Sequence, residues 1–186
     1  MMVQKLKKQL KKLMDVDRYK EISQDISVSL REQIHQRGEA AREFADMLHG
    51  KQIGHALHPI LVSVSVGSWT TALFFDYLGF VTRIRSFQKT GDYLTIVGLG
   101  SAVPSALTGL TDYTAIKQDS ASYAMTHGLI NSFAVYAYTR SLMSRLVGHR
   151  FRALWFATMG FGAVTISSWL GGEMGGEGDG VFSIHN

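Results

Sequence analysis

The sequence predicts an all-α protein, a four-helix transmembrane bundle preceded by an N-terminal amphipathic helical arm. Residues 1–53 hold 11 of the 19 Lys and Arg residues, whereas the rest of the chain is dominated by four long apolar segments. An apolar helix of about 20 residues crosses the hydrocarbon core of a bilayer. We therefore predict an arm (1–53), a transmembrane domain (54–174) and a flexible Gly-rich tail (175–186).

The arm has the composition of a helix, because residues 4–48 contain no proline and only one glycine, Gly38. We expect a break near residues 15–17 or at Gly38. An arm with one apolar face could lie on the membrane surface, bind a partner helix or pair with a copy of itself. Its basic start fits anionic lipid headgroups, and a net charge of +4 does not indicate a nucleic-acid partner. Apolar residues recur at helical spacing at Ile22, Ile26, Leu30 and Ile34.

The four apolar segments lie at about residues 57–80, 93–113, 123–142 and 153–172. At ~1.5 Å per residue each is long enough, or nearly so, to span a bilayer. Pro59 lies in the first turn of the first segment, where its missing N–H costs nothing. The short connections predict antiparallel neighbours. No internal repeat is evident.

Polar side chains gather at one end of this predicted bundle. Because the helices alternate in direction, the first and third segments begin on the face where the second and fourth end. Ionisable groups at membrane depth are costly and indicate a functional site. The residues on this face are His55, His58, Asp112, His127, Asn131 and Glu173.

His58 and His127 begin two parallel segments at a similar depth. Two neutral imidazoles placed in this way could ligate a haem iron from both sides. We predict a haem b site with these two ligands, close to His55, Asn131 and Asp112. The structural alternative is that each histidine caps a helix or binds water at the interface.

A second hypothesis combines His58, His127 and Glu173 in a zinc or iron site. Asp112 could orient a histidine through its second ring nitrogen, and Glu173 could pair with His55 or His58. Structural roles are the alternative for both carboxylates, with Asp112 bound to loop backbone and Glu173 in water. The absence of cysteine excludes disulfides, thiolate metal sites and cysteine catalysis.

At the opposite face, Asp76 is expected to form an ordinary ion pair with Arg83 or Arg85. The excess of Lys and Arg in the connections at this face would by itself place it in the cytoplasm. The basic arm at the other face is difficult to translocate, which favours both termini in the cytoplasm instead.

Four motifs carry a family resemblance. They are G-H-x-L-H-P-x-L-V at 54–62, G-L-x-D-Y at 109–113, H-x-x-x-N at 127–131 and W-L-G-G-E at 169–173. With these motifs the chain resembles the domain-of-unknown-function 2231 family (DUF2231), bacterial four-helix membrane proteins, over about residues 48–182. The resemblance implies a bacterial membrane, and because relatives are sometimes fused to a Rieske domain, it implies redox partners. It implies no established activity.

The chain departs from the family pattern at two places. Ser65 stands where the family usually has proline, and residues 174–177 replace the family's usual continuation after the two glycines. The chain is expected to lie in a lipid bilayer, the bacterial inner membrane, and three functions are considered for it. The first is a haem-binding electron-transfer protein or a subunit of a membrane redox complex, working with other membrane subunits or redox proteins. The alternative is a non-catalytic assembly subunit that docks through its arm; a metal-dependent membrane enzyme is a third hypothesis.

Overall fold

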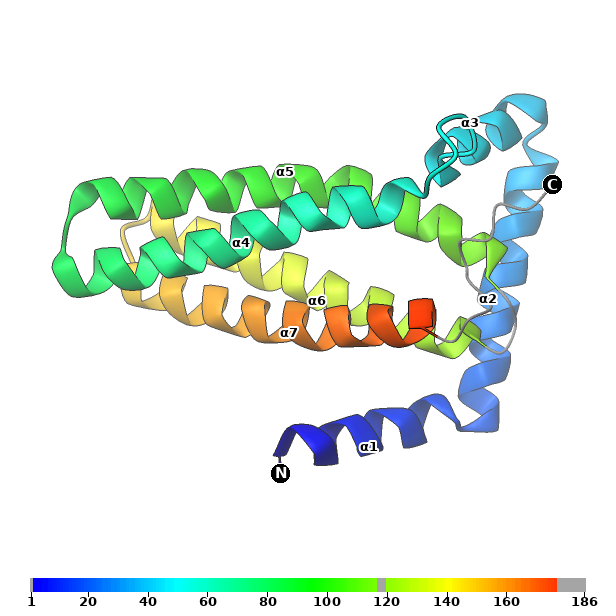
Figure 1. The fold of residues 1–186 in the computed structure, drawn as a ribbon, viewed down its shortest axis with the longest axis horizontal. Coiled ribbons are helices and arrows are strands. Elements are labelled where there is room, and N and C mark those ends of the chain that lie inside the picture. The colour runs from blue at the N-terminus through cyan, green and yellow to red at the C-terminus, as the bar shows by residue number, and fades with distance from the viewer. Residues whose placement is uncertain (1, 117–119, 177–186) are drawn as a thin grey trace.

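The structure is a computed structural model that describes residues 2–116 and 120–176. These residues form seven α-helices and no strand, so the all-α prediction is confirmed. Four long helices lie side by side, and a shorter one crosses one end of them (Figure 1). The helices are α1 (Met2–Met14), α2 (Asp17–Gln36), α3 (Glu39–His49), α4 (Leu57–Thr82), α5 (Arg85–Ala115), α6 (Ala121–Leu146) and α7 (Arg150–Gly176).

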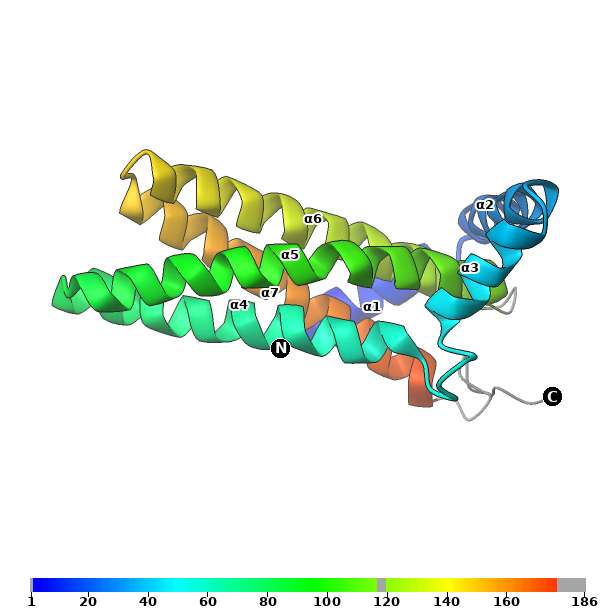
Figure 2. The ribbon, with the colours of Figure 1, turned by 90° about the horizontal axis from the view of Figure 1, so that it is seen from above.

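The bundle consists of two helical hairpins, α4–α5 and α6–α7. Each hairpin packs closely along its length, whereas the contacts between the hairpins are sparser. The turns within the hairpins lie at one end of the bundle. The chain passes from α5 to α6 at the opposite end, where α2 and α3 also lie (Figure 1, Figure 2). The interface between the hairpins is therefore the loosest part of the bundle and has the arm at one of its ends.

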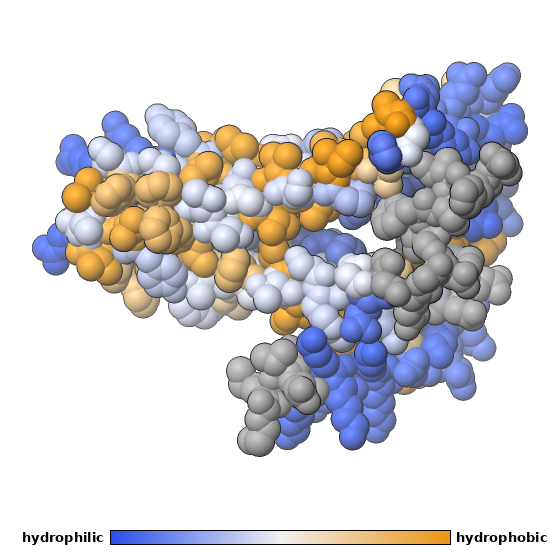
Figure 3. Space-filling view, in the orientation of Figure 1, coloured by the Kyte–Doolittle hydropathy of each residue, from blue (hydrophilic) through white to orange (hydrophobic). Residues whose placement is uncertain are grey.

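Three of the four bundle helices, α4, α5 and α7, are long and apolar enough to cross a membrane among the described residues. The prediction of four such segments is corrected at α6. This helix has 26 residues, as many as α4, but polar and charged side chains lower its hydropathy. Apolar side chains cover much of the outer surface of the bundle (Figure 3), as expected for helices that face lipid. The polar residues of α6 include Ser122, Thr126, His127, Asn131, Ser132, Arg140, Ser141 and Arg145.

The structure reveals a repeat between the two hairpins. Residues at matching intervals occupy equivalent places in α4 and α6, and others do so in α5 and α7. The first three pairs meet across the bundle as neighbouring rings, stacked rings and an ion pair. Parallel repeats of this kind are related by an axis along the bundle, and transporters place their binding sites at such an interface. The pairs are His58 and His127, Trp69 and Tyr138, Asp76 and Arg145, Gly98 and Gly160, Ser105 and Ser167, and Gly109 and Gly171.

Trp69 and Tyr138 form the centre of the bundle. Their rings stack with centroids 4.3 Å apart and planes 7° from parallel. Their relative exposures are 4% and 0%. Gly98 and Gly160 make room for them, because a Cβ at Gly98 would lie 2.4 Å from the indole and one at Gly160 would lie 2.8 Å from the Tyr138 ring. The two glycines therefore allow the hairpins to close around a stacked aromatic pair.

Gly98→Ala is expected to lower the free energy of unfolding by about 1–3 kcal/mol, because the added methyl group overlaps the Trp69 ring. Gly100→Ala on the same helix is the matched control, since a Cβ there meets no atom within 4 Å. Denaturant unfolding in detergent measures both. Equal stabilities of the two variants would contradict the packing role of Gly98.

The arm divides into three helices at the two predicted places. The first break lies between α1 and α2, at residues 15–16. The second is at Gly38, whose φ of 93° lies in the left-handed region that favours glycine. A single break at one of these places was predicted, and the structure has a break at each of them. At the other end of the chain α7 continues to Gly176, and residues 177–186 of the predicted tail lie outside the described part of the chain.

Helix α2 crosses the end of the bundle and is held there by hydrogen bonds. Ser27 Oγ donates to the Tyr113 carbonyl at 2.8 Å, and Arg31 Nε donates to the Thr114 carbonyl at 2.6 Å. The Tyr113 hydroxyl donates in return to the Ser23 carbonyl. The bonds from Ser27 and Arg31 reach carbonyl groups in the last turn of α5, where a helix leaves carbonyls without its regular partners. The Tyr113 carbonyl also accepts from the Ile116 N–H at 3.4 Å.

The apolar face of α2 does not pack on the bundle. Ser23 and Ser27 are its buried residues, whereas Ile22 and Ile26 remain 43% and 39% exposed. The amphipathic role of the arm in binding a membrane or partner therefore stays a prediction.

Candidate functional site

His58 and His127 lie next to each other at the arm end of the bundle. His58 is in the first turn of α4 and His127 in the second turn of α6. Their ring centroids are 6.3 Å apart, and the ring planes cross at 77°. Both side chains are half-buried. The structure thus brings together the two histidines that sequence reasoning selected.

Each imidazole is held by a backbone carbonyl of the neighbouring helix. Nδ1 of His58 lies 2.8 Å from the Ser105 carbonyl oxygen, and Nδ1 of His127 lies 2.9 Å from that of Ser167. A carbonyl oxygen can only accept, so Nδ1 carries the proton of each neutral ring. The lone pair is then on Nε2. Histidines that bind metals are commonly oriented in this way by a partner on their other nitrogen.

A glycine supports each ring. A Cβ at Gly109 would lie 2.7 Å from Cε1 of His58, and a Cβ at Gly171 would lie 3.3 Å from Cε1 of His127. Any larger residue at Gly109 would push the His58 ring away. The two histidines are therefore positioned by the same device in both hairpins, a carbonyl and a glycine one turn apart.

Asn131 completes the site. Its amide Nδ2 donates to Nε2 of His127 at 2.9 Å. Among the described residues, Nε2 of His58 has no hydrogen-bond partner. The Nε2 lone pair of His127 therefore accepts a hydrogen bond from a neutral amide, and the Nε2 lone pair of His58 is available to a ligand.

Asp112 lies elsewhere, with a histidine that sequence reasoning did not consider. Its Oδ1 is 2.8 Å from Nδ1 of His49, at the end of α3, and both side chains are largely buried. Its second oxygen, Oδ2, is buried without a partner in the described residues. The pair joins the arm to α5. No sequence signal could have found it, because the packing of α3 on α5 has no motif of its own.

Glu173 pairs with the arm and with its own helix. It accepts from Lys11 Nζ at 3.2 Å and from Trp169 Nε1 at 3.0 Å. Lys7 Nζ lies 4.3 Å from the centre of the Trp169 ring. The described residues contain no group of three or more His, Asp or Glu side chains placed to hold a metal ion. The structure therefore does not gather Glu173 with the two histidines.

His55 is also apart from the histidine pair. It is exposed and precedes α4 in the connection from the arm. Of the six residues predicted on this face, the structure brings His58, His127 and Asn131 into one cluster. His55, Asp112 and Glu173 surround the same end of the bundle with other roles.

At the opposite end, the predicted pairing of Asp76 with Arg83 or Arg85 is wrong. Asp76 forms an ion pair with Arg145 of α6, with Nη1 2.6 Å from Oδ1. Asp92 accepts from the same guanidinium at 3.0 Å. The partner comes from the other hairpin, and the matching intervals of the internal repeat are the signal that could have found it.

A comparison with known protein families gives a match that covers the whole bundle. A family model described as "Predicted membrane protein (DUF2231)" matches residues 54–181. The chain belongs to this family. The matched range contains all four bundle helices of this DUF2231 protein and leaves the arm outside it. Neither the curated proteins nor the solved structures that were compared gave a match. The family description establishes membrane character, and the chemistry of the site has to be argued from its geometry.

Proposed function

We propose that this DUF2231 protein binds one haem between its two hairpins, with His58 and His127 as axial ligands, and transfers electrons in the membrane. The distance between the rings carries the proposal. Two metal–nitrogen bonds of about 2 Å, with each ring nitrogen about 1 Å from its ring centre, separate opposed ligands by about 6 Å. The observed centroid distance of 6.3 Å is close to this separation, and ligation would also require the two Nε2 atoms to face each other.

The hydrogen bonds of the two rings support the same role. Both Nδ1–H groups donate to backbone carbonyls, at Ser105 and Ser167, which leaves the Nε2 lone pairs for a metal. On ligand binding Asn131 would release Nε2 of His127. If both histidines held a haem iron, no position would remain open to a substrate, and the haem would supply electron transfer. The hydrogen bonds and polarity around it would then tune its potential.

The packing of the hairpins also favours a flat ligand between them. Contacts are sparser between hairpins than within them, and Figure 3 shows the surface hollowed between α4 and α7 toward the arm end. In this proposal α6 is the fourth spanning helix. Its polar side chains are tolerated because small and polar residues of α6 are among those buried in the bundle. The membrane is the bacterial inner membrane, with both termini in the cytoplasm.

An absorption spectrum and metal analysis of the detergent-purified full chain test the proposal. We expect a haem Soret band, or its appearance on titration with haemin, saturating at one haem per chain. Circular dichroism serves as the control for folding. A helical protein that shows no Soret band and no saturable haemin binding would refute the proposal.

The exposed apolar face of α2 favours a second function, docking on another membrane subunit. Ile22 and Ile26 are solvent-exposed in a helix that is otherwise firmly attached to the bundle. Apolar side chains clustered on a surface are typical of interaction sites. Removing residues 1–48 should then release partners that co-purify with the full chain from native membranes. Retention of every partner by the shortened chain would count against docking through the arm.

A further inference from the structure

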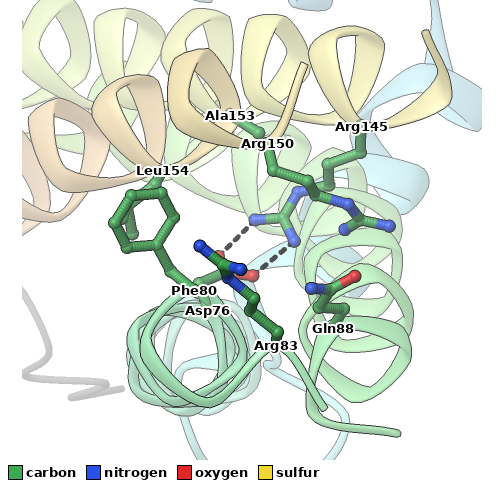
Figure 4. A pocket seen from close by; sticks show the side chains of 8 residues that line it. All are labelled: Asp76, Phe80, Arg83, Gln88, Arg145, Arg150, Ala153 and Leu154. Carbon is green, nitrogen blue, oxygen red and sulfur yellow. Dashed lines mark hydrogen bonds and ion pairs between the residues drawn. The ribbon is translucent and has the colours of Figure 1, made fainter. Parts of the chain in front are cut away.

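A cavity of about 200 Å³ lies at the end of the bundle opposite the histidines. It is lined by three arginines (Arg83, Arg145 and Arg150) together with Gln88, and Figure 4 shows these side chains converging on it from α4, α5, α6 and α7. We propose that this cavity binds a phosphate group, supplied by an anionic phospholipid headgroup or by free phosphate.

The charges around the cavity leave it positive. Arg145 is paired with Asp76 at the buried side of the cavity. Arg150 is paired with Asp92 at 2.5 Å and 2.9 Å. Among the described residues Arg83 has no ion-pair partner, although it lines the same cavity. Three guanidinium groups thus face two carboxylates, and the unbalanced charge is the one nearest the surface.

Arg83 is held in place by an unusual backbone conformation. It caps α4 with φ of 59°, and its N–H donates to the Gly79 carbonyl at 3.1 Å. It is the only non-glycine residue with positive φ in the described part of the chain. A residue with a side chain is strained in this left-handed region. Backbone strain of this kind is concentrated at functional sites. In Figure 4 the Arg83 guanidinium is drawn in front of the Asp76–Arg145 ion pair, and the Arg150 guanidinium lies on the far side of Arg145.

The location of the cavity suits a lipid headgroup. It lies where α4 ends and α5 begins, at the limit of two apolar spans. Phe80 forms part of its wall and contacts Phe151, with ring centroids 6.2 Å apart and both rings exposed. Arginine binds phosphate oxygens through two parallel N–H donors. A phosphate held by the arginines would therefore have an apolar surface beside it for acyl chains.

Native mass spectrometry of the full chain can test this site with three probes: phosphatidylglycerol, phosphatidylcholine and inorganic phosphate. We expect the wild type to retain one phosphatidylglycerol in preference to phosphatidylcholine. Arg83→Gln should lower the retained fraction about tenfold, whereas Arg85→Gln, which removes the same charge two residues away, should change it less than twofold. Arg83→Gly is a second variant that keeps the backbone conformation of the cap.

The outcomes separate the two sources of phosphate. Lipid binding that depends on Arg83 assigns the cavity to a phospholipid headgroup. Binding of inorganic phosphate with the same dependence, without retained lipid, assigns it to free phosphate. The proposal is overturned if neither phosphatidylglycerol nor inorganic phosphate binds. It is also overturned if the Arg83 and Arg85 variants lose binding equally.

Discussion

If the proposed haem is bound, His58→Ala and His127→Ala are each expected to weaken its binding at least about 100-fold, and the double variant is expected to show no saturable binding. The reason is that each imidazole supplies one of two axial bonds, and nothing else in the described site can replace it. The other polar side chains at the two rings are the Asn131 amide and the neutral hydroxyls of Thr108 and Ser167, which are weak ligands for a haem iron. Titration of the detergent-purified variants with haemin, followed by absorbance, measures the change.

His35→Ala is the matched control, because this histidine lies exposed on α2. It should bind haem as the wild type does. Thermal unfolding of all the variants shows whether any loss reflects the site or the fold. Wild-type affinity in a folded His58→Ala or His127→Ala protein would remove that histidine from the ligand set.

Arg145→Ala is expected to lower the free energy of unfolding by about 3–5 kcal/mol, because it leaves the Asp76 carboxylate buried without a partner. Asp76→Ala is expected to cost less, since Arg145 keeps Asp92 as a partner at 3.0 Å. The Asp76 and Arg145 side chains are only 8% and 2% exposed. Equilibrium unfolding in mixed detergent measures the effect. The double variant Asp76→Leu with Arg145→Met should lose less stability than either single variant, since apolar residues of similar size leave no charge behind.

Asp46→Ala serves as the comparison for this pair. Asp46 and Lys51 are 2.6 Å apart, yet their side chains are 48% and 56% exposed. Solvent screening limits such a pair to about 1 kcal/mol or less. If Arg145→Ala costs no more than Asp46→Ala, the buried ion pair does not stabilise the bundle.

Long apolar runs and short connections were sufficient to predict the α-helical bundle and the end at which its histidines meet. The helical period also located both breaks in the arm, because Gly38 and the segment before Asp17 interrupt it. For α6 the length was predictable, but side chains such as His127 and Arg145 lower its hydropathy below that of its neighbours. Length alone therefore overstated its similarity to the other three helices.

The internal repeat escaped detection because its matching residues are few and scattered, and two of the six pairs differ in chemistry. Trp69 matches Tyr138, and the acid Asp76 matches the base Arg145. Such pairs lower sequence similarity while they create contacts across the interface. The two histidines could be predicted as neighbours without the repeat, because they begin two helices that run in the same direction.

The partners of Asp112 and Glu173 were beyond prediction for a different reason. Both bind residues of the arm, His49 and Lys11, whose position depends on how separate helices pack on the bundle end. Neither contact has a spacing in the sequence, since the partners lie far apart along the chain. The arm thus determines the surroundings of the candidate site without sharing its motifs.

The relative orientation of the two histidine rings has a spectroscopic consequence if both bind the haem iron. The planes of His58 and His127 cross at 77°. Two nearly perpendicular imidazoles leave the iron d orbitals close in energy, which gives a highly anisotropic low-spin ferric signal. Electron paramagnetic resonance of the oxidised, haem-loaded full chain is the most direct test. We expect that low-spin signal, lost in both histidine variants; a high-spin signal in the wild type, or one unchanged in the variants, would contradict axial ligation by this pair.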